Sequence, residues 1–427
     1  MKILARATAT GLLLCGVVCL LHGSMLRASD WAWRVGVGYD FLSQQYSLDS
    51  LISLEGDSLA AMTALKTTYL DDLKASFQMT YTPGDQPGLE LGAGLEQTRD
   101  ASRFRVYGSG NPTFGRTRLT WNSDLEWRRA VDGGAAAGES FVTGRARGRL
   151  SVPARTSLTW FADLDADFVA FDVTDRYTRS YQRAGLKAGI TREFGLMSSV
   201  RLAAFTALRQ VPDSTAMNYR NIGAEIWLLG LFSGSTLDVY ARVEARDYHQ
   251  PDGEDDYTRV EITADHTLGL GSSAFFRQIG ELEGMFSNDA DPYGYDYTRA
   301  ELRLLGGVRN TELSAAIGPE IGYMAVRSGD YAPEEDYREY GIATDFDVLS
   351  LSRLFCSLES STGFRNLVYE DDTQSDYTYE RLNLVGDIRL AGRLALSGLV
   401  SAEWEWHDDA DENSQIFLIS TNLTYAF

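Results

Sequence analysis

The residues best suited to chemistry in this sequence are charged side chains that recur at every second position. Arg145, Arg147 and Arg149 alternate with small residues, and Asp163 and Asp165 repeat the spacing on the next extended segment. Residues two apart in a strand point to the same face of a sheet. The pattern predicts guanidinium groups beside carboxylates, which either pair with each other or set up a field across a water-filled space. The candidates for this lining are Arg145, Arg147, Arg149, Asp163, Asp165, Arg259 and Arg299.

Patterns typical of catalysis or of metal binding are weak in this sequence. Beyond residue 28 the histidines are His249, His266 and His407, and none has a zinc-ligand spacing with another histidine or with Cys356. The sequence contains no recognisable nucleophile motif and no glycine-rich phosphate loop that opens a helix. We therefore expect no enzyme, no cofactor and no ordered metal site, with a hydrolase built on a Ser-His pair as a minor alternative.

Acidic residues dominate the charge balance. The formal net charge is -21, and the longer connections between extended segments are rich in Asp and Glu. This balance argues against a nucleic-acid partner. Carboxylate oxygens are the ligands that calcium and magnesium prefer. Weak, diffuse binding of divalent cations is therefore expected at Asp255, Asp256, Glu334 and Glu335, and simple solvation of these charges is the alternative.

Extended strands must position the charged residues. From Trp31 to Phe41 the odd positions are aromatic or apolar and the even positions are small or polar, and similar alternation runs from Leu158 to Phe168 and from Leu394 to Trp406. Strands of about 9–11 residues cross a bilayer when tilted, whereas a helical span needs about 20 apolar residues, and no such run is present. The alternation predicts strands with one lipid-facing side and one water-facing side.

Tyrosines at a regular interval predict the number of strands. Each opens the strand that follows a longer connection, at Tyr177, Tyr219, Tyr257, Tyr297, Tyr337 and Tyr377, with spacings of 42, 38, 40, 40 and 40. One hairpin per 40 residues gives fourteen strands from Thr156 onward and about 20 in all, with 18 or 22 as alternatives. A β-propeller would need four short strands in each repeat, but only two turn clusters occur. The tyrosines either pack the strand ends or form an aromatic rim for a flat solute such as a sugar.

The last segment carries a resemblance to a known class. From Gln415 to Phe427 the odd positions are mostly apolar and the even positions are mostly small or polar, and the segment ends on Tyr425-Ala426-Phe427. This resembles the terminal strand of Gram-negative outer-membrane β-barrel proteins, where a final Phe is read by the assembly machinery. Tyr425 and Phe427 are then the predicted assembly signal. A soluble all-β domain that ends on a strand is the alternative.

The resemblance implies a closed, antiparallel transmembrane β-barrel over residues 29–427, with short periplasmic turns and long acidic external loops. Residues 1–28, with Lys2 and Arg6 before an apolar run, are the expected signal peptide for export to the outer membrane. Residues 43 to 72 fit either a long loop or strands that extend beyond the membrane. Outer-membrane lipid and the assembly machinery are the implied partners.

The same resemblance favours a porin-like channel for passive diffusion of small hydrophilic solutes. The arginine row at 145 to 149 is similar to the constriction zone of general porins. A structural or interaction barrel is the alternative, either an adhesin or a sheath around a periplasmic electron-transfer protein.

Overall fold

The computed structural model describes residues 31–54, 58–84, 88–99, 101–130, 140–172, 180–195, 197–212, 214–249, 256–287, 296–326, 336–350, 353–368, 375–408 and 412–427. The predicted signal peptide lies outside these residues. Within them the chain is almost entirely strand, with one 3-10 turn at Thr215–Met217. No helix in this part of the chain is long and apolar enough to cross a bilayer.

The first half of the chain forms strands of unequal length. These are β1 (Trp31–Leu54), β2 (Ser58–Tyr81), β3 (Glu90–Gln97), β4 (Ala101–Gly110), β5 (Thr113–Phe114), β6 (Thr117–Ala130), β7 (Phe141–Arg155), β8 (Leu158–Phe171), β9 (Tyr181–Glu193), β10 (Ser199–Gln210) and β11 (Tyr219–Phe232). The second half is regular. Its strands are β12 (Ser235–Tyr248), β13 (Tyr257–Leu270), β14 (Ala274–Ser287), β15 (Tyr297–Arg309), β16 (Leu313–Val326), β17 (Tyr337–Ser350), β18 (Leu354–Leu367), β19 (Tyr377–Ala391), β20 (Leu394–His407) and β21 (Ser414–Ala426).

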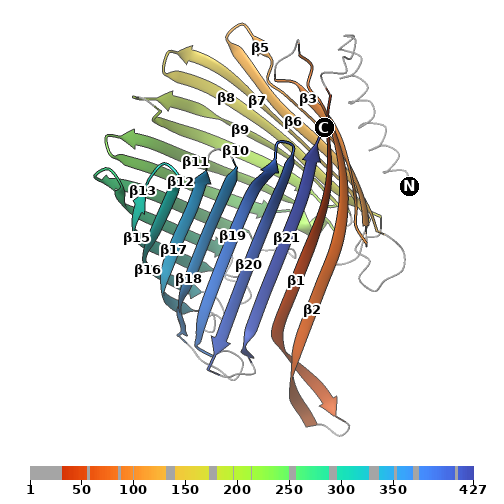
Figure 1. The fold of residues 1–427 in the computed structure, drawn as a ribbon, viewed down its shortest axis with the longest axis vertical. Coiled ribbons are helices and arrows are strands. Elements are labelled where there is room, and N and C mark those ends of the chain that lie inside the picture. The colour runs from red at the N-terminus through yellow and green to blue at the C-terminus, as the bar shows by residue number, and fades with distance from the viewer. Residues whose placement is uncertain are drawn as a thin grey trace.

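Twenty of the described strands form one closed ring. Each pairs antiparallel with its neighbours, and the two-residue β5 pairs with β6 while β4 bonds β6 directly. The ring closes where β1 pairs with β21, from Arg34↔Ala426 to Gln45↔Gln415. Figure 1 shows β21 beside β1 at the seam, with β20 and β19 continuing the near wall on the other side of β21. The predicted all-β barrel of about 20 strands is confirmed, including fourteen strands after Thr156.

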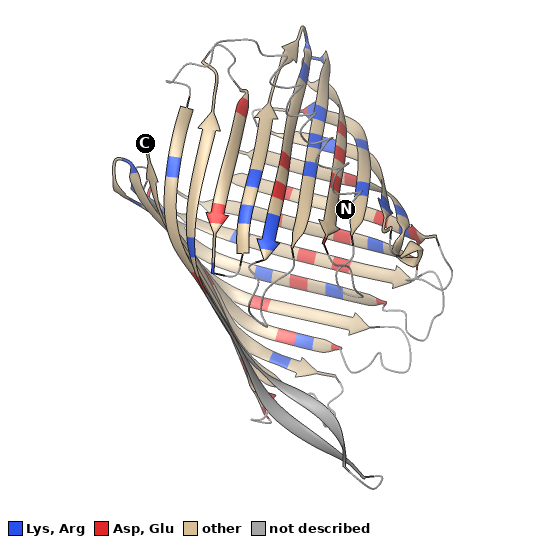
Figure 2. Ribbon diagram, turned by 90° about the vertical axis from the view of Figure 1, so that its right-hand side faces the viewer, with Lys and Arg blue, Asp and Glu red and all other residues tan. Residues whose placement is uncertain are grey.

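The strand registers place every second residue on the same side around the ring, apart from register shifts next to Arg155 and Ala391. Arg147 lies opposite Asn122 on β6 and Asp165 on β8, while Leu164 lies opposite Gly148 and Leu186. The apolar set faces outward and is highly exposed, as at Leu164 with 63% of its surface accessible. Since a slip of one residue would exchange the two faces, the apolar pattern excludes any slip by an odd number of residues. The charged face is the lumen, and charged positions occur along the strands as well as at their ends (Figure 2).

Connections at the end of the ring that holds Phe427 are short where the structure describes them. Ser233 and Gly234 alone join β11 to β12, and Gly234 has a φ of +83°, a conformation that favours glycine. At the opposite end β1 and β2 continue as a two-stranded ribbon, paired as far as Leu54↔Ser58, beyond the last pair of β1 with β21 (Figure 1). Residues 43 to 54 and 58 to 72 are therefore strand.

The wall is a single layer, so its most buried apolar patch lies on the lumen face. Phe275, Leu305, Ala316 and Ala343 form this patch on β14 to β17. Arg277 on β14 reaches Asp345 on β17 at 3.0 Å, and this bridge must pass over the two strands between them. Long lumen-facing side chains thus cover the wall from inside.

Candidate functional site: the charged lumen wall

Two arcs of the lumen wall carry opposite net charge. Among the described residues that face the lumen, β4 to β10 carry eleven cations and six carboxylates. Strands β13 to β20 carry eight cations and thirteen carboxylates. We call these the basic arc and the acidic arc. Since β7 and β17 stand ten places apart in the ring of twenty, the arcs lie on opposite sides of the lumen.

The members of each arc follow from the registers. The cations of the basic arc are Arg103, Arg105, Arg118, Arg128, Arg145, Arg147, Arg149, Arg183, Lys187, Arg201 and Arg209. The carboxylates of the acidic arc are Glu261, Asp265, Glu281, Glu283, Glu301, Glu320, Glu339, Asp345, Asp347, Glu359, Asp387, Glu403 and Glu405.

The predicted arginine row on β7 has two kinds of member. Arg149 forms a bidentate pair with Asp163, with both N–O distances at 2.6 Å, and stacks over Phe161. Arg145 and Arg147 are exposed and form no ion pair with the described residues. Their register neighbours Asp167 and Asp165 are bound by Arg183 from β9, at 3.1 and 2.8 Å. The row therefore presents two unpaired guanidinium groups to the lumen.

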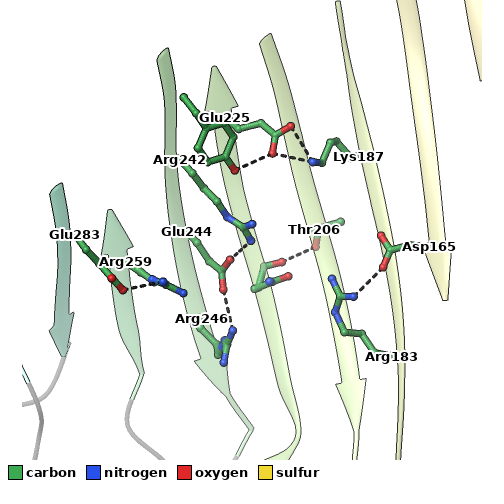
Figure 3. Close-up of polar contacts among 12 residues, drawn as sticks. Asp165, Arg183, Lys187, Thr206, Glu225, Arg242, Glu244, Arg246, Arg259 and Glu283 are labelled. Atoms are coloured by element: carbon green, nitrogen blue, oxygen red, sulfur yellow. Dashed lines mark hydrogen bonds and ion pairs between the residues drawn. The ribbon is translucent and has the colours of Figure 1, made fainter. Parts of the chain in front are cut away.

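Ion pairs within a strand, or reaching across to a nearby strand, occupy the wall that follows. Lys187 on β9 bonds both oxygens of Glu225 on β11, and Glu244 on β12 lies between Arg242 and Arg246 (Figure 3). The candidates further along are also paired. Arg259 lies 2.7 Å from Glu283, and Arg299 lies 3.5 Å from Glu301.

The acidic arc contains a buried network that the sequence analysis missed. The Glu339 side chain is only 5% exposed and binds Arg365 at 2.5 Å and Arg381 at 3.1 Å. Arg381 also bonds Glu403 at 2.8 Å. Beside this network Tyr379 is fully buried, lying over Gly341 and Gly363, where an added Cβ would come within 2.6 Å of the tyrosine hydroxyl. The two glycines create the space that Tyr379 fills.

The tyrosines at the loop end of the strands pack against arginines. Arg246 lies over the rings of Tyr219 and Tyr257, at 4.2 and 4.9 Å, and Arg365 lies over Tyr337 and Tyr377, at 4.0 and 5.2 Å. Tyr219, Tyr337 and Tyr377 are buried. These contacts favour packing of the strand ends over stacking on a solute.

Tyr297 and Tyr177 are the two remaining predicted tyrosine positions. Tyr297 donates a hydrogen bond to Glu283 at 2.7 Å. Tyr177 lies outside the described residues, and the strand that it was expected to open begins at Tyr181.

The residue just before each of these strands closes the base of a loop. Asp256 accepts a hydrogen bond from the backbone N–H of Tyr248 at 2.6 Å, and Asp336 and Asp376 accept equivalent bonds from Val326 and Leu367. The same bond recurs at Ser140, Ser180, Asn218, Asp296 and Asn413. We call these residues the loop clasps. Their spacing was visible in the sequence beside the tyrosines, but their partner lies on the preceding strand.

The remaining candidates are the histidines, the expected cation ligands and the C-terminal aromatic residues. His266 faces outward beside Ser235, and His407 lies 3.3 Å from Glu412. Asp255, Glu334 and Glu335 lie outside the described residues, within which no group of three or more potential metal ligands occurs. The Phe427 ring packs edge-to-face against Tyr425 with ring centres 4.9 Å apart, and its backbone N–H donates to the carbonyl of Trp33 at 2.9 Å.

No protein-family model and no curated protein matches the sequence. The structure is similar to the alcaligin outer-membrane receptor FauA of Bordetella pertussis, with a TM-score of 0.57 and 11% identity over 95% of this chain and 77% of that one. It is also similar to OpdK of Pseudomonas aeruginosa, solved with vanillate (TM-score 0.50, 11% identity, 93% and 99% coverage), and to OccAB3 of Acinetobacter baumannii (TM-score 0.50, 9% identity, 93% and 100% coverage).

These comparisons establish the fold class. The chain has the closed antiparallel barrel of porin-like outer-membrane proteins. The predicted resemblance to outer-membrane barrels is therefore confirmed.

Proposed function

We propose that this protein is a porin-like channel through which small hydrophilic solutes diffuse passively across the outer membrane of a Gram-negative bacterium. The observation that carries the proposal is the exposed pair Arg145 and Arg147, which form no ion pair with the described residues and lie on the lumen side of a twenty-strand ring. An ionised group is costly to keep away from water unless it is paired, so these side chains require a hydrated lumen.

The size of the ring supports the same proposal. Barrels of 16–18 strands leave an aqueous channel, and this ring has twenty. The outward face is apolar and the inward face charged, as expected of a wall between lipid and water. In this orientation the short turns face the periplasm, the acidic loops face outward, and the final strand with Tyr425 and Phe427 engages the assembly machinery.

Planar-bilayer recording of the purified protein tests the proposal. We expect discrete conductance steps, and a reversal potential in a KCl gradient that changes when Arg145, Arg147 and Arg149 are all replaced by Gln. Removing three lumen cations should lower the anion-to-cation permeability ratio by about threefold, because wall charges concentrate counter-ions.

The matched control removes the same charge from the lipid side. Arg192, Arg220 and Arg338 have the outward register, so their triple replacement by Gln should leave the ratio unchanged. Absence of any conductance would overturn the channel proposal. A conducting protein whose ratio is the same in both triple variants would show that the row on β7 does not line the open path.

A further inference from the structure

A cavity of about 460 Å³ opens on the lumen side of β11 to β14. Its walls combine two aromatic rings, three carboxylates and a hydroxyl, from Trp227, Tyr240, Asp238, Asp265, Glu281 and Thr263. The volume lies within the range of pockets that hold small ligands, roughly 300–1,000 Å³. None of its lining residues is cationic.

The cavity lies at mid-height in the wall. Trp227, Tyr240, Thr263 and Glu281 are successive register partners on four neighbouring strands. Glu281 is the eighth of fourteen residues in β14. A solute that passes through the lumen therefore meets this cavity midway.

The aromatic side of the cavity is held in place. The Trp227 indole N–H donates to Asp238 at 2.5 Å, and Arg201 from the basic arc lies over the indole ring at 5.0 Å. The Tyr240 hydroxyl donates to Glu225 at 3.5 Å. Aromatic faces attract cations, and ordered rings beside carboxylates suit an organic cation better than a strongly hydrated metal ion.

The charge of the cavity remains negative after its internal pairing. Arg277 bonds Asp265 at 2.7 Å and neutralises one carboxylate, and Arg201 over the indole ring is a second cation against the three carboxylates. Asp238 is engaged by the indole N–H. Glu281 is exposed and forms no hydrogen bond or ion pair with the described residues. Glu281 also lines a second, smaller cavity together with Glu261, Glu283 and Glu301, which Arg299 partly balances.

We propose that this cavity is a subsite for an alkylammonium cation, with Glu281 as the ion-pairing group and Trp227 and Tyr240 as its aromatic walls. The inference rests on the proposed channel, since the solute reaches the cavity through the lumen. The solutes that this cavity would retain are amines and polyamines of low mass.

Spermidine serves as the probe. In planar bilayers at low KCl concentration, spermidine should reduce the current through the wild-type protein, and Glu281→Gln should raise the half-blocking concentration about fivefold, as for loss of one partly exposed ion pair. Glu359→Gln is the matched control. Glu359 is another exposed, lumen-facing glutamate of the acidic arc without an ion pair among the described residues, but it lies outside the cavity.

A rise in Glu281→Gln with a change below about twofold in Glu359→Gln supports the subsite. Equal rises in both variants, or a conducting wild-type protein that spermidine does not block, overturn it while the channel proposal stands. If no conductance is found, calorimetric titration of spermidine into the same three proteins in detergent decides the question. Binding that is weakened only in Glu281→Gln supports the subsite although the channel proposal has failed, and absence of binding overturns the subsite as well.

Discussion

The basic arc and the acidic arc follow the same alternation, yet they present their charges differently. On β7 the guanidinium groups of Arg145 and Arg147 are exposed because Arg183 binds the carboxylates opposite them. On β16 and β17 the carboxylates of Glu320 and Glu339 are buried, at 1% and 4% exposure, against arginines of neighbouring strands. Alternation therefore decides which side a charge faces, and neighbouring strands decide whether water and solutes reach it.

This difference separates paired charges, which stabilise the wall, from unpaired charges, which interact with ions and solutes in the lumen. A buried ion pair that loses one partner leaves an uncompensated charge, whereas an exposed unpaired charge costs little to remove. Replacing a paired residue should therefore cost more stability than replacing an unpaired or isosteric counterpart.

The largest effect is expected at Glu339. Glu339→Ala removes the partner of both Arg365 and Arg381 and should lower the free energy of unfolding by about 3 kcal/mol. Glu359→Ala should leave it nearly unchanged. Urea titration of protein refolded into lipid vesicles, followed by tryptophan fluorescence, measures both. Equal values for the two variants would mean that the network on β17 to β20 does not stabilise the barrel.

A smaller effect is expected in the arginine row. Arg149→Ala breaks the bidentate pair with Asp163, which is partly exposed, and should cost about 1 kcal/mol in the same titration. Arg147→Ala should change stability little and should instead change ion selectivity. If Arg147→Ala destabilises as much as Arg149→Ala, the distinction between structural and solute-facing arginines is wrong.

The sequence predicted the barrel well because its signal is local. A period of two residues and an interval near 40 can be read without knowing which strands are neighbours. They predicted fourteen strands after Thr156, about 20 in all, and the residues that face the lumen. Pairing depends on register, which the sequence does not display. The bridge from Arg277 to Asp345 joins residues 68 apart, and the burial of Tyr379 needs Gly341 and Gly363 on two other strands.

The loop clasps also depend on a contact between strands that the sequence does not reveal. A polar residue before each tyrosine is visible in the sequence, but the N–H that it binds belongs to the strand on the other side of a loop. The interval of the tyrosines alone predicts a strand start at Tyr177, whereas Ser180 and Tyr181 occupy the equivalent positions.

The smallest effect is expected at a single loop clasp. Asp336 accepts the N–H of Val326 at 2.5 Å through one carboxylate oxygen. Asp336→Ala leaves that N–H without its partner and should lower the free energy of unfolding by about 0.5–1 kcal/mol. Asp336→Asn keeps an acceptor oxygen and should restore most of the loss. An Asn variant as unstable as the Ala variant would show that charge, and not the hydrogen bond, is what matters.

Asp336→Asn also tests the expected weak binding of divalent cations, because Asp336 directly follows the expected positions Glu334 and Glu335. Calcium binds carboxylates in preference to a single amide oxygen, so any stabilisation by millimolar calcium at constant ionic strength that depends on Asp336 should disappear in Asp336→Asn while the clasp persists. Thermal unfolding midpoints of the wild-type protein and this variant, with and without calcium, separate the two contributions. If the unfolding midpoint of the wild-type protein is the same with and without calcium, the loop carboxylates are solvated charges that bind no cation, and Asp336 serves only as a hydrogen-bond acceptor.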